Sequence, residues 1–129
     1  MIVNDDKQFE SQIVEAKSLE ELALVLEKLL KGYAVWDDGT LCFIKRKVDE
    51  VEGMKIEIYS NEHSPPHFHV KSAGLDASFG IENCELINGS IGSRERKIIE
   101  WWHERCKTKL VSIWNETRPT NCPVGQIRN

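Results

Sequence analysis

The 129-residue sequence predicts one α+β domain, with an amphipathic helix and a hairpin toward the N-terminus, an antiparallel β-meander, and a long C-terminal helix packed on the sheet. Three observations predict this class. Residues 19–30 carry apolar side chains at helical spacing, residues 54–91 contain short runs that alternate apolar with polar side chains, and residues 93–114 return to helical spacing. Because the length is typical of one domain, we expect one shared core.

The first clear element is a helix that begins after Ser18. Ser18 and Glu21 form a capping box, in which the serine hydroxyl accepts a hydrogen bond from a free amide of the first turn. Apolar side chains then follow on one stripe, and Gly32 provides the stop. The preceding residues 9–17 match neither period cleanly, so they predict either a strand or an earlier helix.

Turn residues divide the middle of the chain into strands. Two β-rich runs, residues 33–36 and 41–44, flank an Asp-Asp-Gly-Thr turn, which predicts a hairpin. An acidic linker follows, and the meander is predicted from alternating runs at residues 54–59, 67–70, 77–81 and 84–91. We therefore divide the chain into an N-terminal helix and hairpin extension (1–50), a histidine and proline β-meander with its helix (51–117) and a coil tail (118–129), which together form one compact unit.

The last helix has an apolar face and many charges. Ser93 is its candidate N-cap, and the apolar face is expected to lie against the sheet. Its basic residues are Arg94, Arg96, Lys97, Arg105, Lys107 and Lys109. Together with Trp101, which lies off the main apolar face, they define either a surface that binds nucleic acid or an acidic partner, or a solvated face interleaved with glutamates. Trp101 alternatively packs on the N-terminal helix or on a partner subunit.

Composition narrows the class of protein. The net charge of −4 opposes nonspecific attraction to nucleic acid, although residues 93–129 carry 8 basic and 4 acidic side chains. No stretch approaches the roughly 20 uninterrupted apolar residues of a membrane span, and the N-terminus lacks the pattern of a signal peptide. We therefore expect a cytoplasmic protein with no membrane partner. The four cysteines are scattered, which predicts reduced packing thiols and no zinc ribbon.

The chemically unusual feature is a cluster of histidines around two prolines. His67 and His69 are two residues apart in a strand-like run, so their imidazoles project from the same face. The Pro65-Pro66 turn would bend the chain so that His63 joins them. Three imidazoles around Zn²⁺ or another divalent transition metal would leave an open position for water.

Glu62 and His63 are the catalytic candidates of this cluster. Beside a metal, Glu62 would act as general base, while Asp76 and Tyr59 are further candidates for base, fourth ligand or oxyanion donor. Two other interpretations stay open: structural imidazoles with satisfied ring nitrogens, and metal-free acid–base or phosphate contacts that use the near-neutral titration of histidine.

From about residue 54 to residue 116, the chain resembles the bacterial domain-of-unknown-function 4160 family. The residues that carry this resemblance run from Ile58 to Val70 around the Pro-Pro-His-Phe-His core, followed by residues 77–81, the Gly89 to Gly92 turn and the helix from Trp101 to Trp114. The resemblance implies a small β-meander with a helix, in many cases encoded beside toxin–antitoxin partners, and no established activity. The sequence departs from that family by Glu62, where aspartate is frequent, and by about 50 extra N-terminal residues.

Three functions follow as hypotheses. The leading one is a noncatalytic protein-interaction module, either the antitoxin-like or regulatory member of a toxin–antitoxin or defence system or simply a homodimer. The second is a metal-dependent hydrolase or nuclease with His63, His67 and His69 as ligands. The third is a nucleic-acid-binding protein that uses the basic last helix. The candidate binding residues are Tyr59, Pro65, Pro66, Phe68 and Trp101.

Overall fold

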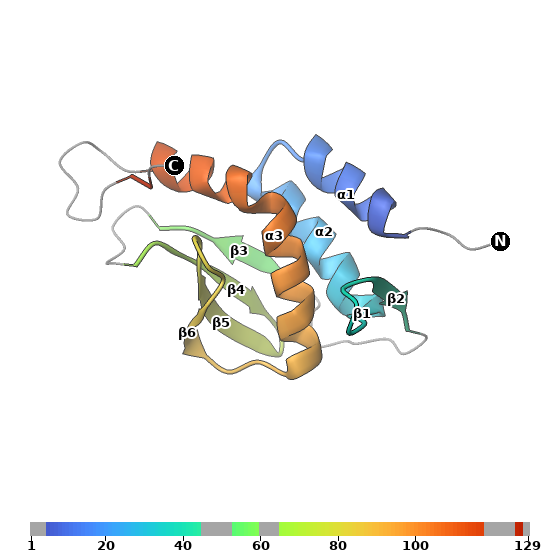
Figure 1. Cartoon of the computed structure of the whole chain (residues 1–129). Helices are drawn as coiled ribbons and strands as arrows, with labels where there is room; N and C mark the ends of the chain where they lie inside the picture. The colour runs from blue at the N-terminus through green and yellow to red at the C-terminus, as the bar shows by residue number, and fades with distance from the viewer. Residues whose placement is uncertain (1–4, 45–52, 60–64, 118–125, 128–129) are drawn as a thin grey trace.

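A computed structural model of the chain describes residues 5–44, 53–59, 65–117 and 126–127. Within these residues the fold is α+β, as predicted: two N-terminal helices, a two-stranded and a four-stranded antiparallel sheet, and a long C-terminal helix (Figure 1). The elements in chain order are α1 (Asp5–Glu15), α2 (Leu19–Gly32), β1 (Tyr33–Val35), β2 (Leu41–Phe43), β3 (Lys55–Glu57), β4 (His67–Ser72), β5 (Leu75–Gly80), β6 (Leu86–Gly89) and α3 (Ser93–Glu116).

The N-terminal segment forms two helices, because its apolar side chains can all reach one core. Residues 9–17, whose period left the element type open, lie mostly in α1, where Phe9 and Ile13 are one turn apart and buried. Ser18 caps α2 as predicted, and its hydroxyl accepts a hydrogen bond from the Glu21 amide at 3.2 Å. The Glu21 carboxylate reaches back to the amide of Lys17, one residue before the position that a capping box predicts.

The strands follow the predicted turns. In the hairpin β1–β2, Gly39 has φ +88°, a conformation that a side chain would strain. The four-stranded sheet has the order β3-β4-β5-β6, with every neighbouring pair antiparallel, which is the predicted meander. Ile87 is an extra residue in β6, since Ser78 pairs with Asn88 while Phe79 pairs with Leu86. The resulting bulge interrupts the regular edge of the sheet at β6.

The helix α3 begins at Ser93, but its N-cap is Gly92, so the prediction of Ser93 as the cap was wrong by one residue. The reason is that Gly92 still has extended backbone while its carbonyl oxygen already accepts a hydrogen bond from the Arg96 amide at 2.9 Å, and Ser93 is itself helical. A β-carbon at position 92 would come within 2.2 Å of the Glu95 carboxylate, so glycine permits this approach. The helix crosses one face of the four-stranded sheet (Figure 1).

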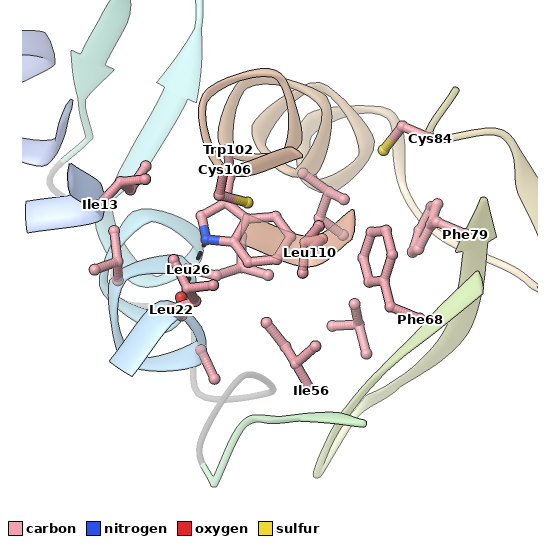
Figure 2. Close-up of a cluster of buried hydrophobic side chains, with 14 of the residues drawn as sticks. Ile13, Leu22, Leu26, Ile56, Phe68, Phe79, Cys84, Trp102, Cys106 and Leu110 are labelled. Carbon is pink, nitrogen blue, oxygen red and sulfur yellow. Dashed lines mark hydrogen bonds between the residues drawn. The ribbon is translucent and has the colours of Figure 1, made fainter. Parts of the chain in front are cut away.

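The core lies between α2, α3 and that face of the sheet. Figure 2 shows Trp102, Cys106 and Leu110 of α3 among Leu22 and Leu26 of α2 on one side and Phe68 and Phe79 of the sheet on the other. Trp102 is fully buried, its ring centroid lies 5.7 Å from that of Phe68, and its indole N–H donates to the Leu22 carbonyl oxygen at 3.1 Å. The N-terminal extension is therefore part of the same core.

Two basic residues of α3 fix the ends of the N-terminal helices. Arg94 donates to the Leu30 carbonyl oxygen at 2.8 Å and to that of Tyr33, at the C-terminal end of α2. Lys109 donates to the carbonyl oxygens of Ile13 and Val14, both at 2.7 Å, and to that of Ala16, at the end of α1. Helix C-termini leave carbonyl groups without intrahelical partners and carry partial negative charge, so both cations stabilise the fold.

The cysteines in the described residues are free thiols, as predicted. Cys84 and Cys106 are buried and Cys42 is half-buried, while Cys122 lies outside the described residues. Burial raises the pKa of Cys84 to about 12 and raises that of Cys106 further, so both thiols stay protonated and unreactive at neutral pH. Among the described helices, none is long and apolar enough to cross a membrane.

The predicted coil tail lies mostly outside the described residues. Two of its residues, Gln126 and Ile127, are described and return to the end of α3. The Asn115 side chain donates to the Ile127 carbonyl oxygen at 3.0 Å and accepts from the Ile127 amide at 2.7 Å. This paired hydrogen bond ties Ile127 to the apolar core.

Replacing Lys109 by methionine tests the contact between α3 and α1. We expect Lys109→Met to lower the free energy of unfolding by about 2 kcal/mol, because three carbonyl oxygens lose a charged donor while the alkyl stem is retained. Urea denaturation followed by circular dichroism measures the change. Lys107→Met, at an exposed position of the same helix, is the matched control. Equal stability of the two variants would contradict the capping role of Lys109.

Candidate functional site

The two faces of the four-stranded sheet differ in chemistry because side chains alternate along β4. Phe68 and Val70 are fully buried against the helices, whereas His67, His69 and Lys71 point to the opposite face. Cross-strand pairing places two more polar side chains on this second face. Glu57 of β3 and Ser78 of β5 each pair with His69, one from either side. We call Glu57, Tyr59, His67, His69, Lys71 and Ser78 the polar cluster.

His67 and His69 lie next to each other on this face, as their spacing predicted. Their ring centroids are 5.0 Å apart, with an angle of 64° between the ring planes. His67 is only 4% exposed, and its Nδ1 lies 2.7 Å from the Pro65 carbonyl oxygen. Because a carbonyl oxygen can only accept, His67 Nδ1–H is the donor, so in the neutral form of the ring the lone pair is on Nε2.

His69 connects the histidine pair to the rest of the polar cluster. Its Nδ1 lies 2.9 Å from the hydroxyl oxygen of Ser78, which is 4% exposed. On its other side, the Tyr59 ring makes an edge contact with the His69 ring at a centroid distance of 4.9 Å. Because Ser78 is almost fully buried, its hydroxyl has little access to a substrate in this structure.

Tyr59, Glu57 and Lys71 form a charged hydrogen-bond network at the edge of the cluster. The Tyr59 hydroxyl donates to Glu57 at 2.6 Å and accepts from the Lys71 ammonium at 3.3 Å, while Lys71 lies 3.5 Å from Glu57. The Tyr59 hydrogen bond, followed by the Lys71 charge, lowers the pKa of Glu57. The hydrogen bond that Lys71 donates to the Tyr59 hydroxyl, followed by the Glu57 carboxylate, raises the pKa of Lys71. Both side chains are therefore charged at neutral pH.

The predicted catalytic residues, Glu62 and His63, lie outside the described residues, and His63 is also the predicted third metal ligand. Across residues 5–44, 53–59, 65–117 and 126–127, no group of three histidine, cysteine, aspartate or glutamate side chains is positioned to hold a metal ion. Asp76, a further candidate, pairs in register with Lys71 on the polar face and is exposed.

The five candidate binding residues occupy different environments. Tyr59 is 39% exposed on the polar face, Pro65 is exposed and Pro66 is half-buried, with its carbonyl oxygen accepting from the Ile81 amide at 3.0 Å. Phe68 is fully buried in the core, on the face opposite the histidines. Trp101 is 4% exposed, and the Arg105 guanidinium covers its ring at 3.7 Å from the centroid. Phe68 and Trp101 therefore contribute to packing and present little surface to a ligand.

Four of the six basic residues of α3 contact other parts of the described structure. Besides Arg94 and Lys109, which bind helix ends, Arg105 donates to Glu10 at 3.2 Å and Lys97 lies 3.9 Å from Asp37. Phosphate binding would have to compete with these contacts. The geometry of α3 thus lends no support to the prediction of a nucleic-acid surface on this helix.

His103 belongs to α3 and lies on the helix side of the sheet. Its ring stacks on Phe68 at a centroid distance of 6.1 Å, and its Nε2 lies 2.6 Å from the Ile81 carbonyl oxygen. His67 and His69 occupy the other face, so His103 does not join them. Burial lowers the pKa of His103, with Lys107 acting in the same direction and the Ile81 carbonyl, Glu104 and Glu100 opposing.

Sequence reasoning did not identify Ser78 as a partner of His69, although a signal was available. A two-residue turn at Ala73-Gly74 fixes the register of β4 and β5, and counting outward from it places His69 opposite Ser78. The pairing of Glu57 with His69 had no such signal, because residues 58–66 separate β3 from β4 and a connection of that length does not fix register.

These features define a class of protein: a small α+β domain in which helices cover one face of a four-stranded antiparallel sheet and the opposite face carries a polar cluster around two imidazoles. Residues 53–115, just under half of the chain, match the family model described as domain of unknown function (DUF4160). The resemblance predicted from the Pro-Pro-His-Phe-His segment is thereby confirmed. No curated protein and no solved structure matched the chain. The matched segment leaves out α1, α2 and the hairpin.

The buried His103 predicts a loss of stability in acid. A lowered pKa in the folded state means that the unfolded chain binds more protons below its ordinary histidine pKa of about 6.5. We therefore expect the free energy of unfolding to fall as the pH drops through 6.5, and to fall less in His103→Gln, which keeps a donor for Ile81. Urea denaturation at a series of pH values measures both curves. His63, His67 and His69 are present in both proteins, so parallel curves would contradict a role for His103.

Proposed function

We propose that this chain is a small protein-interaction module that acts without catalysis. The observation that supports this proposal is the position of its exposed apolar side chains. Four of the six large apolar residues that the described structure leaves exposed belong to the N-terminal extension: Val14 at 75%, Leu24 at 56%, Trp36 at 62% and Phe43 at 63%. Aromatic and aliphatic side chains of this kind are typical anchors of protein interfaces.

The core of the molecule does not need these side chains. Trp36 and Phe43 belong to the hairpin region, next to a core that already contains Trp102, Trp114, Phe68 and Phe79 in fully buried positions. Exposing two aromatic rings to water on one hairpin has no benefit for folding, since burial of apolar surface is the main stabilising term. A partner that covers them would gain that free energy on binding.

A more specific version of the proposal gives the chain a regulatory role in a two-gene system. The chain would be the antitoxin-like or regulatory member of a toxin–antitoxin or defence system, located in the cytoplasm, and the simplest alternative partner is a second copy of the chain. The support for this form is the family resemblance over residues 53–115. Relief of growth arrest when the chain is co-expressed with the product of an adjacent gene would test it.

The proposed function predicts a defined assembly. The tagged full chain, expressed at native level in its source organism, is expected to co-purify with one partner in stoichiometric amount, or to be a homodimer by light scattering. The aromatic side chains of the hairpin provide the reason, because their exposure to water is unfavourable. Recovery of a monomer without a stoichiometric partner would argue strongly against an interaction module.

A second candidate function is supported by the histidine pair. The hydrogen bond from His67 Nδ1–H to a backbone carbonyl is the arrangement that orients metal-ligating histidines in proteins, with Nε2 directed to the metal. His67 and His69 would be two ligands and His63 the third, around Zn²⁺ or another divalent transition metal, with Glu62 as general base of a hydrolase or nuclease.

Zinc titration separates the two candidate functions. If the histidines hold a metal, calorimetry should show about one equivalent of Zn²⁺ bound, with binding weakened at least tenfold in His67→Ala and in His69→Ala, because a three-ligand site cannot lose one imidazole without loss of affinity. His103→Gln, which removes an imidazole from the opposite face, is the control and should bind as the wild type does. Absence of zinc binding, together with an unchanged melting temperature, would rule out the metal site.

A further inference from the structure

An apolar groove runs between helix α2 and the edge strand β3. Its cavity has a volume of about 460 Å³ and is lined by Glu20, Ala23, Leu24, Met54, Lys55, Ile56 and Glu57. This volume lies within the range of about 300–1,000 Å³ that is typical of binding pockets. Leu24 on the helix wall is 56% exposed although it belongs to the leucine-rich α2. The groove is thus a preformed space with an apolar wall open to solvent.

The other wall of the groove is the free edge of the sheet. In the described part of the chain, β3 pairs with β4 and with no other strand, so one row of its backbone groups is directed away from the sheet. Next to the strand, the Met54 amide donates to the Glu27 side chain of α2 at 3.2 Å, which fixes the separation of helix and strand. An edge strand beside a helix is the geometry in which an extended peptide adds a strand to a sheet.

The opposite edge of the sheet is less suited to strand addition. The bulge at Ile87 disturbs the ladder of β6, and Gly89, with φ +88°, ends the strand. A β-carbon at Gly89 would come within 2.3 Å of the Asp76 carbonyl oxygen, so the backbone is crowded there. Bulges of this kind protect sheet edges from pairing with other chains. The regular, groove-lined edge is the one at β3.

The charges of the groove indicate the character of its occupant. Two carboxylates, Glu20 and Glu57, line it against one ammonium, Lys55. Glu57 is already paired with Lys71 and Tyr59, whereas no ion pair of Glu20 is found within the described residues. A cation on the occupant would therefore complement Glu20, at the first turn of α2.

We propose that the groove between α2 and β3 binds an extended segment of another protein, which adds a strand to β3, inserts an apolar side chain against Leu24 and Ile56, and places a lysine or arginine beside Glu20. This proposal rests on the proposed function as an interaction module and assigns its docking site. The hairpin aromatics Trp36 and Phe43 form a separate surface, which does not line the groove.

A library of random linear 12-residue peptides displayed on phage, selected against the full chain, tests the proposal. We expect enriched peptides to share an apolar residue close to a lysine or arginine. A synthetic peptide of that consensus should slow amide hydrogen exchange in residues 54–57. Its affinity should fall about tenfold in Leu24→Ser, where apolar burial is lost, and about threefold in Glu20→Gln, where a partly exposed ion pair is lost. Trp36→Ser, at a position of similar exposure on the hairpin, is the control and should bind as the wild type does.

Four outcomes would contradict the proposal that the groove is the docking site. They are failure to enrich any peptide, a consensus without a cation, unchanged affinity in Leu24→Ser, and protection of a segment other than β3 from hydrogen exchange. The proposed function is judged separately with the co-purified partner. A partner that binds Leu24→Ser normally but is lost in Trp36→Ser would keep the interaction module and reject the groove, whereas the lack of any partner would reject the module itself.

Discussion

Trp102 provides the interaction on which the arrangement of the molecule depends. Its ring packs on Phe68 of the sheet, and its indole N–H donates to the carbonyl oxygen of Leu22, 80 residues earlier in the chain. One side chain thus fixes helix α3 between the sheet and helix α2 (Figure 2). If α2 moved, the buried indole N–H would lose its acceptor, which costs about 1–3 kcal/mol. The hydrogen bond therefore specifies the position of α2 in addition to stabilising it.

The position of α2 makes the N-terminal extension part of the same core as the segment that matches the family. The family match covers residues 53–115, yet Leu26, Leu29 and Leu30 of α2 are fully buried in the same core as the matched segment. Arg94 and Lys109 add charged hydrogen bonds from α3 to the ends of α2 and α1. Basic side chains that suggested a nucleic-acid surface thus serve to hold the extension in place, and the extension in turn forms one wall of the groove beside β3.

Packing also determines the chemistry of the two sheet faces. Once Phe68 and Val70 are buried under the helices, alternation along β4 directs His67, His69 and Lys71 to the other face. Cross-strand pairing then brings Glu57 and Ser78 to His69, and Tyr59 joins Glu57 with Lys71. The polar cluster therefore forms as a consequence of how the core packs as well as of the local sequence. Its hydrogen bonds fix the orientations of the His67 and His69 rings.

Local patterns were enough to predict the helix after Ser18, the Asp-Gly hairpin, the alternating strands of the meander and the shared face of His67 and His69, because each of these follows from periodicity, capping or turn chemistry. Periodicity did not decide whether residues 9–17 formed a helix or a strand, since that outcome depended on burying Phe9 and Ile13 in a core built by distant residues. Tertiary contacts, in contrast, bury Trp101, engage Arg94, Arg105 and Lys109 with the N-terminal helices, place His103 across the sheet from His67 and His69, and form a groove between α2 and β3. The physical reason is that such features are contacts between segments far apart in the chain, and local patterns carry no information about which segment a face will meet.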